Sequence, residues 1–361
     1  MPGAVNLKCS LKARCGGCAW FDIALDDQEA RKLEPIRAVF PAAEFVYKPA
    51  ERVRDRADLV WQDGRLGLYG LGSSREIVDL TECPMMSERL EAFLLEYRKR
   101  KPPITRGSVR LRVAPDGRRG VWLDFANQDV KTLFQEREYL RWLSDLAFVE
   151  IGQRRKHLVW KEGAPKLVDP ELHAWFETYA GGGLAIPLYG PVGGFSQAGF
   201  AANRALVNSV MRAVQASGVN HWVELFCGNG NFTLAMASRG LQVEAVEMDP
   251  LAIEGLEMSL KTTGLQVKLA RADVYLKAKT LPDLQGRGLL VDPPRSGLKQ
   301  LLEVLEAGSK PRSLVYVSCF NQSFLSDLER LRAMGARIES IEGVDQFPHS
   351  AHAEWVARLS F

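Results

Sequence analysis

Apolar residues in the second half of the chain fall into short runs that are separated, for the most part, by longer segments with helical patterns. The runs are almost continuously apolar, as expected for parallel strands buried on both faces. They cover residues 222–226, 242–246, 267–270, 288–291 and 313–318. Helices are expected at residues 203–215, 251–263, 301–308 and 323–332, and a closing antiparallel pair at residues 337–343 and 354–361. This alternation predicts an α/β fold with a Rossmann-like sheet.

The first half has a different pattern, in which helices and strand pairs do not alternate regularly. We expect helices over residues 26–40 and 87–100, and a hairpin over residues 52–70 that turns at Asp63-Gly64. Further strands are expected at residues 106–113, 120–125, 148–151 and 157–161. The glycine- and proline-rich stretch 180–194, with Gly181-Gly182-Gly183, predicts a boundary. The sequence thus predicts an N-terminal α+β domain, residues 1–185, and an α/β domain, residues 190–361.

Composition agrees with a two-domain globular protein. The chain has 361 residues, of which 46% are hydrophobic and 25% charged, and this length suits about two domains. No apolar run approaches the roughly 20 residues of a membrane helix, and the N-terminus lacks the apolar core of a signal peptide. We therefore expect a cytoplasmic protein without a membrane partner.

Net charge alone says little about partners, because +3 is too small to indicate nucleic acid. Its local distribution says more. Basic residues gather at predicted strand ends and turns, at Arg54, Arg56, residues 98–101, Arg110 and Arg112. Any single group is typical of a solvated surface, but several together favour a phosphate-contacting face.

The central motif is a strand, a glycine-rich turn and a helix over residues 222–237. Gly228 and Gly230 allow the backbone to approach a ligand closely. Glu247 ends the next strand about 20 residues later, where a carboxylate can bind an adenosine ribose. A dinucleotide site needs a third glycine for close packing, but this chain has Thr233 there. The motif therefore favours S-adenosylmethionine over NAD or a purely structural turn.

Four of the six cysteines lie in the first part of the chain: Cys9, Cys15, Cys18 and Cys83. Two glycines separate Cys15 from Cys18, a spacing at which two thiolates can bind one metal centre. Cys83 precedes Pro84, as cluster ligands often precede proline. Four such ligands suit a [4Fe–4S] cluster or a structural zinc ion, and their uneven spacing favours the iron–sulfur cluster. The alternative is a set of unrelated thiols. Of the other two cysteines, Cys227 is expected to pack in the glycine-rich turn.

Polar residues follow several of the predicted parallel strands, at the edge where open α/β sheets bind ligands. Asp292 begins an Asp-Pro-Pro-Arg sequence after one strand, and Cys319 follows the next. A cysteine between a strand end and a helix N-terminus is expected to have its thiolate favoured. The Asp-Pro-Pro sequence resembles a methyltransferase motif that presents a planar amine or base to the methyl group.

Together, these motifs resemble the RNA uracil-5-methyltransferases from Cys9 to the C-terminus. The matching segments after the boundary are Phe195-Ser196-Gln197, residues 225–232, Glu247, Asp273, Asp292-Pro293-Pro294-Arg295, Ser318-Cys319 and Phe347-Pro348-His349, with His352 and Glu354. The resemblance implies that Cys319 is the nucleophile, that Glu354 is the general base, and that Gln197 and Asp292 hold the uracil or orient the cofactor. It implies S-adenosylmethionine contacts from Gln197, Phe226, Asn231, Glu247, Asp273 and Asp292.

The resemblance also implies a substrate and a second cofactor. Members that methylate 23S ribosomal RNA hold a cluster, here on Cys9, Cys15, Cys18 and Cys83, whereas the tRNA members lack it. No counterpart of the nucleic-acid-binding TRAM barrel of some relatives precedes Cys9, so the chain is similar to the short ribosomal RNA subfamily. We expect a monomer that modifies RNA, and 23S ribosomal RNA in particular.

Three positions depart from the family pattern. Phe320 follows the cysteine where Asn is usual, with Asn321 one place later; Gln197-Ala198-Gly199 replaces Gln-x-Asn; and Arg54-Asp55-Arg56 replaces Arg-Asn-Lys/Arg. The alternatives are a methyltransferase of the same fold that acts on tRNA uridine, on an amine or on a protein, and a non-catalytic RNA-binding factor. Methyl transfer from labelled S-adenosylmethionine to RNA separates the last of these from the others.

Overall fold

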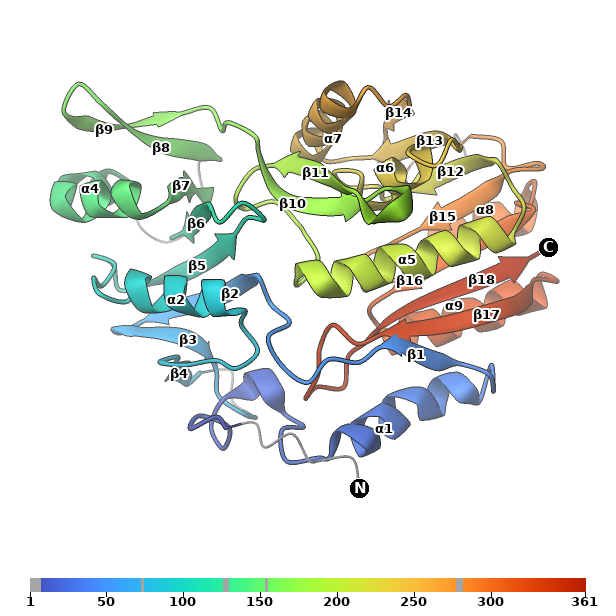
Figure 1. The fold of residues 1–361 in the computed structure, drawn as a ribbon, viewed down its shortest axis with the longest axis horizontal. Coiled ribbons are helices and arrows are strands. Elements are labelled where there is room, and N and C mark those ends of the chain that lie inside the picture. The colour runs from blue at the N-terminus through green and yellow to red at the C-terminus, as the bar shows by residue number, and fades with distance from the viewer. Residues whose placement is uncertain (1–7, 73–74, 126–129, 153–154, 277–281) are drawn as a thin grey trace. The chain divides into compact units, whose positions relative to one another are not determined.

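The computed structural model describes residues 8–72, 75–125, 130–152, 155–276 and 282–361. It divides into two compact units (Figure 1). The first unit contains Met1–Ala24, Ala50–Phe176 and Gly190–Phe200, and the second contains Leu25–Pro49, Glu177–Tyr189 and Ala201–Phe361. The chain therefore passes between the units several times, whereas the sequence predicts one boundary between residues 185 and 190. Among the described residues, none of the helices has both the length and the apolar character to span a bilayer.

Within the described residues, the second unit is built on an eight-stranded sheet with the order β1-β17-β18-β16-β15-β12-β13-β14. The strands are β1 (Glu44–Tyr47), β12 (His221–Leu225), β13 (Gln242–Glu247), β14 (Lys268–Arg271), β15 (Gly288–Val291), β16 (Ser313–Ser318), β17 (Arg337–Val344) and β18 (Glu354–Ser360). Strands β12 to β16 pair in parallel, and β18 is antiparallel to both β16 and β17. The predicted Rossmann-like α/β sheet and its closing antiparallel pair are confirmed.

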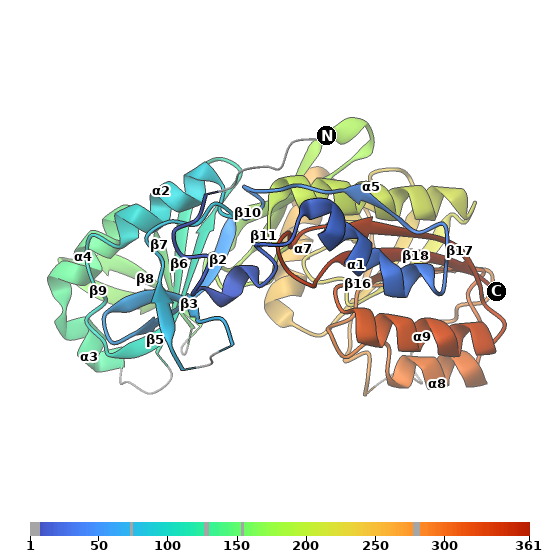
Figure 2. The same cartoon turned by 90° about the horizontal axis from the view of Figure 1, so that it is seen from below.

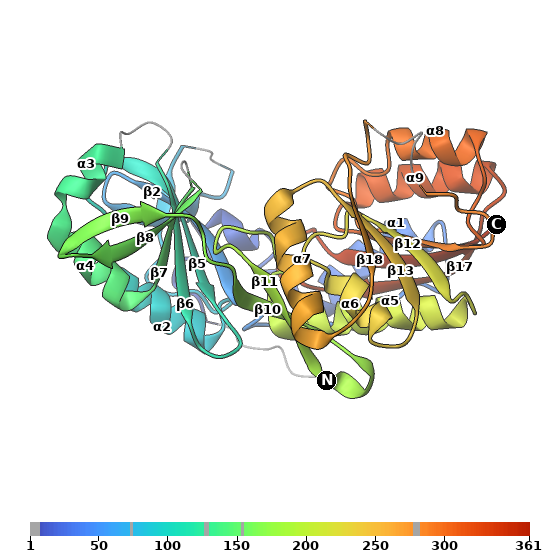
Figure 3. The same ribbon diagram turned by 90° about the horizontal axis from the view of Figure 1, so that it is seen from above.

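Helices cover both faces of this sheet. They are α1 (Leu25–Arg37), α5 (Phe200–Ala216), α6 (Asn231–Ala237), α7 (Pro250–Thr263), α8 (Gln300–Ala307) and α9 (Asn321–Ala333). Figures 2 and 3 show α8 and α9 on one side of the sheet and α5 on the other. Leu33 of α1, Leu305 of α8 and Phe324 of α9 belong to one buried cluster with strand residues such as Val291 and Tyr316. Helix α1 therefore completes the core of this sheet.

Strand β1 was not predicted from the sequence. It pairs in parallel with β17 at the edge of the sheet, through Glu44 opposite Glu342 and Phe45 opposite Gly343. Its four residues alternate between exposed and half-buried. A short edge strand with one solvated face lacks the continuous apolar run that reveals a central strand.

The first unit contains a second eight-stranded sheet, with the order β4-β3-β2-β5-β6-β7-β8-β9 within the described part of the chain. Its strands are β2 (Arg56–Gln62), β3 (Arg65–Tyr69), β4 (Ile77–Asp79), β5 (Arg106–Val113), β6 (Arg119–Asp124), β7 (Phe148–Ile151), β8 (Lys156–Lys161) and β9 (Ala164–Val168). All pairs are antiparallel except β6 with β7. The predicted hairpin at Asp63-Gly64 is the β2–β3 turn.

Helices α2 (Glu88–Tyr97), α3 (Val130–Gln135) and α4 (Arg137–Leu146) accompany this sheet. Phe93 of α2 and Leu140 of α4 are completely buried in one cluster with Leu111 of β5. The α+β character predicted for the first half is thus confirmed.

The glycine run at 181–183 has a local role. It lies in the connection between β10 (His173–Tyr179) and β11 (Ala185–Gly190), which form a two-stranded sheet. Gly182 and Gly183 have φ of 75° and 81°, in the left-handed region that favours glycine. The run therefore makes a turn between paired strands.

Candidate active site

The predicted strand-end residues of the second unit lie at one edge of its sheet. Strands β12, β13, β15 and β16 run in parallel, so Phe226, Glu247, Asp292 and Cys319, at or just after their ends, share that edge. Strand β18 is antiparallel to β16 and pairs Trp355 with Ser318. Glu354 therefore begins β18 at the edge where Cys319 leaves β16.

The turn after β12 uses backbone conformations that glycine favours. Gly228 and Gly230 have φ of 55° and 94°, and Phe226 has φ of 62°. A Cβ atom on Gly230 would lie 2.4 Å from Cδ1 of Leu256 in α7. Gly230 is thus required for the close approach of the turn to α7 as well as for its backbone conformation.

Glu247 holds this turn against β13. Its Oε2 accepts from the N–H of Gly228 at 2.9 Å, and its Oε1 accepts from Met248 at 2.7 Å and Asp249 at 2.9 Å. A carboxylate has about four acceptor positions, so these three bonds leave capacity for a ligand hydroxyl. The predicted ribose contact of Glu247 stays a prediction.

Two other predicted cofactor residues have local partners. The side-chain amide of Asn231 exchanges hydrogen bonds with Asn203 of α5, at 2.8 and 2.9 Å. Asp273 accepts through Oδ1 from the backbone N–H groups of Tyr275 and Leu276. The ring of Tyr275 lies 5.2 Å from that of Phe226, so an aromatic pair adjoins the turn. Asn203 was missed from the sequence, because a polar residue on an amphipathic helix gives no sign that it is buried.

Burial perturbs the two carboxyl groups beside Cys319. It raises the pKa of Glu354, which is 5% exposed, to about 8; the nearby Asp292 adds to this shift and Arg295 opposes it. Burial also raises the pKa of Asp292 to about 7. Groups with perturbed pKa values that lie together at a ligand-binding sheet edge are typical of catalytic sites.

Cys319 differs from its predicted state. Burial, with the negative charges of Glu354 and Asp292 acting in the same direction and Arg295 opposing them, raises the pKa of its thiol to about 11. The predicted preference for the thiolate is therefore wrong in this structure, because burial and two acidic neighbours outweigh the N-terminus of α9. A cation bound beside these carboxyl groups would shift the equilibrium toward the thiolate.

Glu224 is a further buried acid that sequence reasoning missed. It is 1% exposed, accepts a hydrogen bond of 2.5 Å from Thr233 Oγ1, and has its pKa raised by burial to about 8. The sequence signal that could have indicated this buried acid is a glutamate inside the apolar run 222–226. Its bond to Thr233 ties β12 to α6 and so fixes the intervening turn.

Gln197 belongs to the first unit, whereas the residues above belong to the second. Gln197 is 8% exposed, whereas Phe195, two residues earlier, is 73% exposed. Arg56 donates to the carbonyl oxygen of Ser196 at 2.6 Å and fixes this segment. The contact of Gln197 with the cofactor or the uracil stays a prediction.

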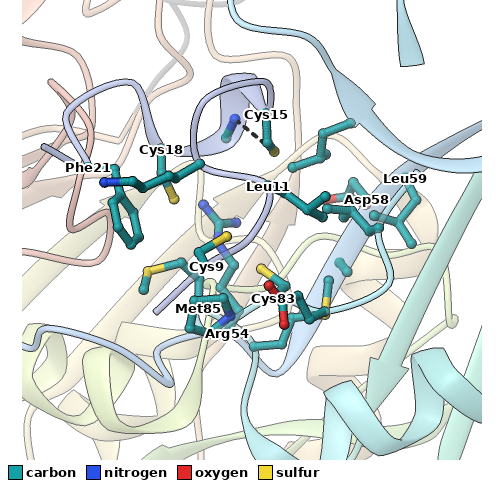
Figure 4. Close-up of a pocket in the computed structure, with 18 residues that line it drawn as sticks. Cys9, Leu11, Cys15, Cys18, Phe21, Arg54, Asp58, Leu59, Cys83 and Met85 are labelled. Carbon is teal, nitrogen blue, oxygen red and sulfur yellow. Dashed lines mark hydrogen bonds between the residues drawn. The ribbon is translucent and has the colours of Figure 1, made fainter. Parts of the chain in front are cut away.

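The four N-terminal cysteines line a single cavity of about 220 Å³ in the first unit. Figure 4 shows Cys9, Cys15, Cys18 and Cys83 around this pocket, with Arg54 among them. The spacing of Cys15 and Cys18 has a structural basis, since Cys15 Sγ accepts from the N–H of Gly17 at the start of a short 3-10 helix, Gly16–Cys18.

The thiols in this pocket are close enough to affect one another. Burial raises the pKa of Cys18 to about 12, and Cys83 and Cys15 contribute in the same direction, while Arg54 opposes them. Within the described ranges, no three His, Cys, Asp or Glu side chains are grouped so that they could hold a metal ion. The structure thus brings the four cysteines to one cavity without the converged geometry of a metal site.

Several arginines predicted to contact phosphate have structural roles. Arg112 is 3% exposed and donates to the carbonyl oxygen of Gly194. Arg56 and Arg110 pair with Asp58, and Arg98 binds Asp79 with two hydrogen bonds of 2.7 and 2.6 Å. The prediction is wrong for Arg112, which is buried.

Other cations of the predicted basic face lie at the surface. Lys99, Arg100 and Lys101, which follow α2, are exposed. For these residues a phosphate-contacting role stays a prediction.

Comparisons with known proteins find methyltransferases among the relatives of this chain. A family model described as tRNA (Uracil-5-)-methyltransferase matches residues 189–360. The uncharacterized RNA methyltransferase Bd2056 of Bdellovibrio bacteriovorus is 37% identical over 372 residues, which cover 98% of this chain and 95% of that protein. The 23S rRNA (uracil(1939)-C(5))-methyltransferase RlmD of Methylococcus capsulatus is 31% identical over 386 residues, which cover 99% of this chain and 83% of that protein.

A solved structure shares the fold. The tRNA (uracil-54, C5)-methyltransferase of Pyrococcus abyssi, in complex with S-adenosyl-L-homocysteine, superposes with a TM-score of 0.64 at 20% identity, over 96% of this chain and 86% of that one. On the strength of the sequence relatives, which match over most of their length, the chain belongs to the RNA uracil-5-methyltransferase family of enzymes.

Proposed function

We propose that this protein transfers a methyl group from S-adenosylmethionine to C5 of a uridine in 23S ribosomal RNA, through a temporary bond between Cys319 and C6 of the base. The observation that carries the proposal is that Cys319 directly follows β16 and Glu354 begins its paired strand β18, so both lie at one sheet edge, beside Asp292. A nucleophile and a base at one ligand-binding edge are what this reaction requires.

The chemistry assigns a step to each group. Carbon C5 of uracil is a poor nucleophile, and addition of the Cys319 thiolate to C6 converts the base to an enolate that is nucleophilic at C5. S-adenosylmethionine, when bound, supplies an electrophilic methyl group on a sulfonium. The Glu354 carboxylate then accepts the C5 proton, the bond from sulfur to C6 breaks, and the thiolate is restored. The target uridine must be unstacked to reach these groups.

The proposed cofactor site follows the glycine-rich turn. Phe226, Asn231, Glu247 and Asp273 lie at or beside the ends of β12, β13 and β14, and Asp292 follows β15. Acidic side chains at this edge suit a ligand with ribose hydroxyls and positive charge. We assign Gln197 to the same ligand or to the uracil.

We expect Glu247→Ala to weaken S-adenosylmethionine binding by about 1.5–3 kcal/mol, the range for lost hydrogen bonds to a charged group. Part of this loss comes through the turn, because the Gly228 N–H also loses its acceptor. Isothermal titration calorimetry measures the change, and Glu257→Ala on α7, which is exposed, is the control. Unchanged affinity would contradict the ribose assignment.

We further propose that Cys9, Cys15, Cys18 and Cys83 bind a [4Fe–4S] cluster. The gathering of all four thiols around one cavity and the all-sulfur donor set support this proposal. The positive charge of a metal centre would also remove the barrier that burial places on ionising these thiols.

Protein purified without oxygen is expected to be brown and to contain about four iron and four sulfide per chain. Cys18→Ser is expected to lower the iron content and destabilise the first unit, because it removes a half-buried ligand. Cys227→Ser, in the second unit, is the matched control and is expected to keep its iron. Colourless protein with one zinc per chain would refute the cluster and select the zinc alternative.

Mass spectrometry of RNA tests the substrate. The 23S rRNA (uracil(747)-C(5))-methyltransferase RlmC of Proteus mirabilis is 27% identical over 375 residues, which cover 96% of each protein. This likeness and that to RlmD support ribosomal RNA as the substrate. In a deletion strain we expect one 5-methyluridine of 23S ribosomal RNA to revert to uridine, with tRNA unchanged. Loss from tRNA instead would select the tRNA alternative.

A further inference from the structure

Helix α1 carries two buried polar residues outside every site described above. Gln28 and Lys32 are 2% and 1% exposed. They are four positions apart, so their side chains lie on the same face of the helix. Burying an amide or an ammonium group is unfavourable unless it is hydrogen-bonded. The partners of these two residues therefore indicate what this face of α1 stabilises.

Lys32 binds the segment that follows β17. Its Nζ donates to Asp345 Oδ2 at 2.7 Å and to the carbonyl oxygen of Phe347 at 3.2 Å. The other carboxylate oxygen, Asp345 Oδ1, accepts from the N–H of Phe347 at 3.0 Å. The ion pair thus fixes both the carboxylate and the backbone of one turn.

Gln28 binds the same segment two residues further on. The N–H of His349 donates to Gln28 Oε1 at 2.8 Å, and Gln28 Nε2 lies 3.1 Å from His349 Nδ1. His349 has φ of 61°, a conformation that residues other than glycine rarely adopt. These bonds therefore hold a backbone conformation that is disfavoured by itself.

The fixed segment belongs to the loop that ends at Glu354. Val344 at the end of β17 pairs with Glu354 at the start of β18, so residues 345–353 leave the sheet edge and return to it. Burial lowers the pKa of His352 in this loop, and the positive charges of Arg295 and Lys32 contribute. The loop therefore lies near both α1 and Arg295, whose charge also acts on Cys319 and Glu354.

We propose that Gln28 and Lys32 are positioning residues, which fix residues 345–349 so that the loop holds the Glu354 carboxylate where it meets the C5 proton of the bound uracil. The inference rests on the proposed function, because Glu354 accepts this proton only in a uridine methyltransferase. In this proposal, Gln28 and Lys32 affect the reaction indirectly, by fixing the loop that precedes Glu354.

Loss of these contacts is expected to slow proton removal more than addition of the thiolate. Cys319 follows β16, which pairs with β15 and β18, whereas Glu354 is the first residue of β18 and directly follows the loop. The loop is therefore expected to affect the position of Glu354 more than that of Cys319. A misplacement of a catalytic group by about 1 Å costs on the order of 100-fold in rate. Methylated RNA joined to Cys319 is therefore expected to accumulate in variants without these contacts.

The test compares Lys32→Met and Gln28→Leu with Glu34→Gln, a matched control on the exposed side of α1. We expect kcat to fall about 10- to 100-fold in the first two variants, with KM for unmethylated 23S ribosomal RNA and affinity for S-adenosylmethionine close to wild type. A denaturing gel is expected to show a shifted protein–RNA band with unmodified RNA. The control is expected to match wild type in kcat, KM, affinity for S-adenosylmethionine and the absence of the shifted band.

The double variant Lys32→Met/Asp345→Asn separates positioning from stability. Lys32→Met alone leaves a buried carboxylate without its ammonium, whereas the double variant removes both charges. We expect its melting temperature to recover while kcat stays low, because the hydrogen bond that ties the Phe347 carbonyl to Lys32 of α1 is still missing. Wild-type kcat in both the double variant and Gln28→Leu would overturn the inference.

Trapping of the wild type by RNA with 5-fluorouridine is the reference measurement. If wild type is trapped and the variants turn over normally, only the positioning role is refuted. If wild type binds fluorinated RNA and is never trapped, the proposed function fails instead.

Discussion

Cys319→Ala is expected to abolish methyl transfer, with a loss of about 10⁴-fold or more, because alanine cannot add to C6 and uracil C5 then stays a poor nucleophile. Affinity for S-adenosylmethionine is expected to be unchanged, since the cofactor contacts come from the ends of other strands. Transfer of label from S-adenosylmethionine to ribosomal RNA measures the loss, and calorimetry shows that the site remains folded.

Covalent trapping makes this prediction specific. Fluorine at C5 cannot leave as a cation, so RNA with 5-fluorouridine at the target is expected to remain joined to wild-type Cys319 and to give a shifted band on a denaturing gel. Cys319→Ala is expected to give no such band while still binding the RNA. A band of equal intensity with Cys319→Ala would show that another residue is the nucleophile, and direct methylation of an amine predicts no band in either protein.

Glu354→Gln is expected to stop the reaction at a later step than Cys319→Ala does. Glutamine cannot accept the C5 proton, so addition and methylation still proceed, but elimination is blocked. The expected result is a loss in turnover of about 10²–10⁴-fold, the usual range for a general base, with methylated RNA held on Cys319. Mass spectrometry of the protein–RNA band from unmodified substrate detects the additional methyl group. Turnover near the wild-type value would exclude Glu354 as the base.

The pH dependence follows from the same proton transfer. Glu354 acts as the carboxylate and Cys319 as the thiolate, and burial raises their pKa values to about 8 and about 11. Both groups are therefore mostly protonated at neutral pH in this structure. Because Glu354 acts after methyl transfer, kcat is expected to rise as the pH increases through about 8. A rate that falls over this range would contradict the roles assigned to both groups.

The strands of the catalytic sheet could be predicted because they are buried on both faces. The runs at residues 288–291 and 313–318 coincide with β15 and β16, and such strands need apolar residues at every position. The glycine-rich turn was equally visible, because Gly228 and Gly230 adopt conformations that favour glycine. These signals depend only on residues that are close together along the chain, so they can be recognised in the sequence.

Features that depend on contacts between distant segments could not be predicted. Helix α1 was expected from the sequence. Its place in the second unit depends on Leu33, which packs in one buried cluster with residues some 300 positions away, such as Leu331. The burial of Arg112 depends on its carbonyl partner Gly194. The identity of a basic residue in a strand does not indicate whether its side chain faces solvent or the interior.

For this protein, the sequence by itself determined the order of strands and helices from β12 to β18, the glycine-rich turn, the four-cysteine motif, and the residues at the edge of the catalytic sheet. Only the tertiary structure decided how those residues are charged and held. It showed that burial beside Asp292 and Glu354 opposes the Cys319 thiolate, that Glu224 is a buried acid bonded to Thr233, and that Gln28 and Lys32 hold the loop before Glu354. The physical reason is that elements arise from neighbours along the chain, whereas pKa values and loop positions arise from neighbours in space.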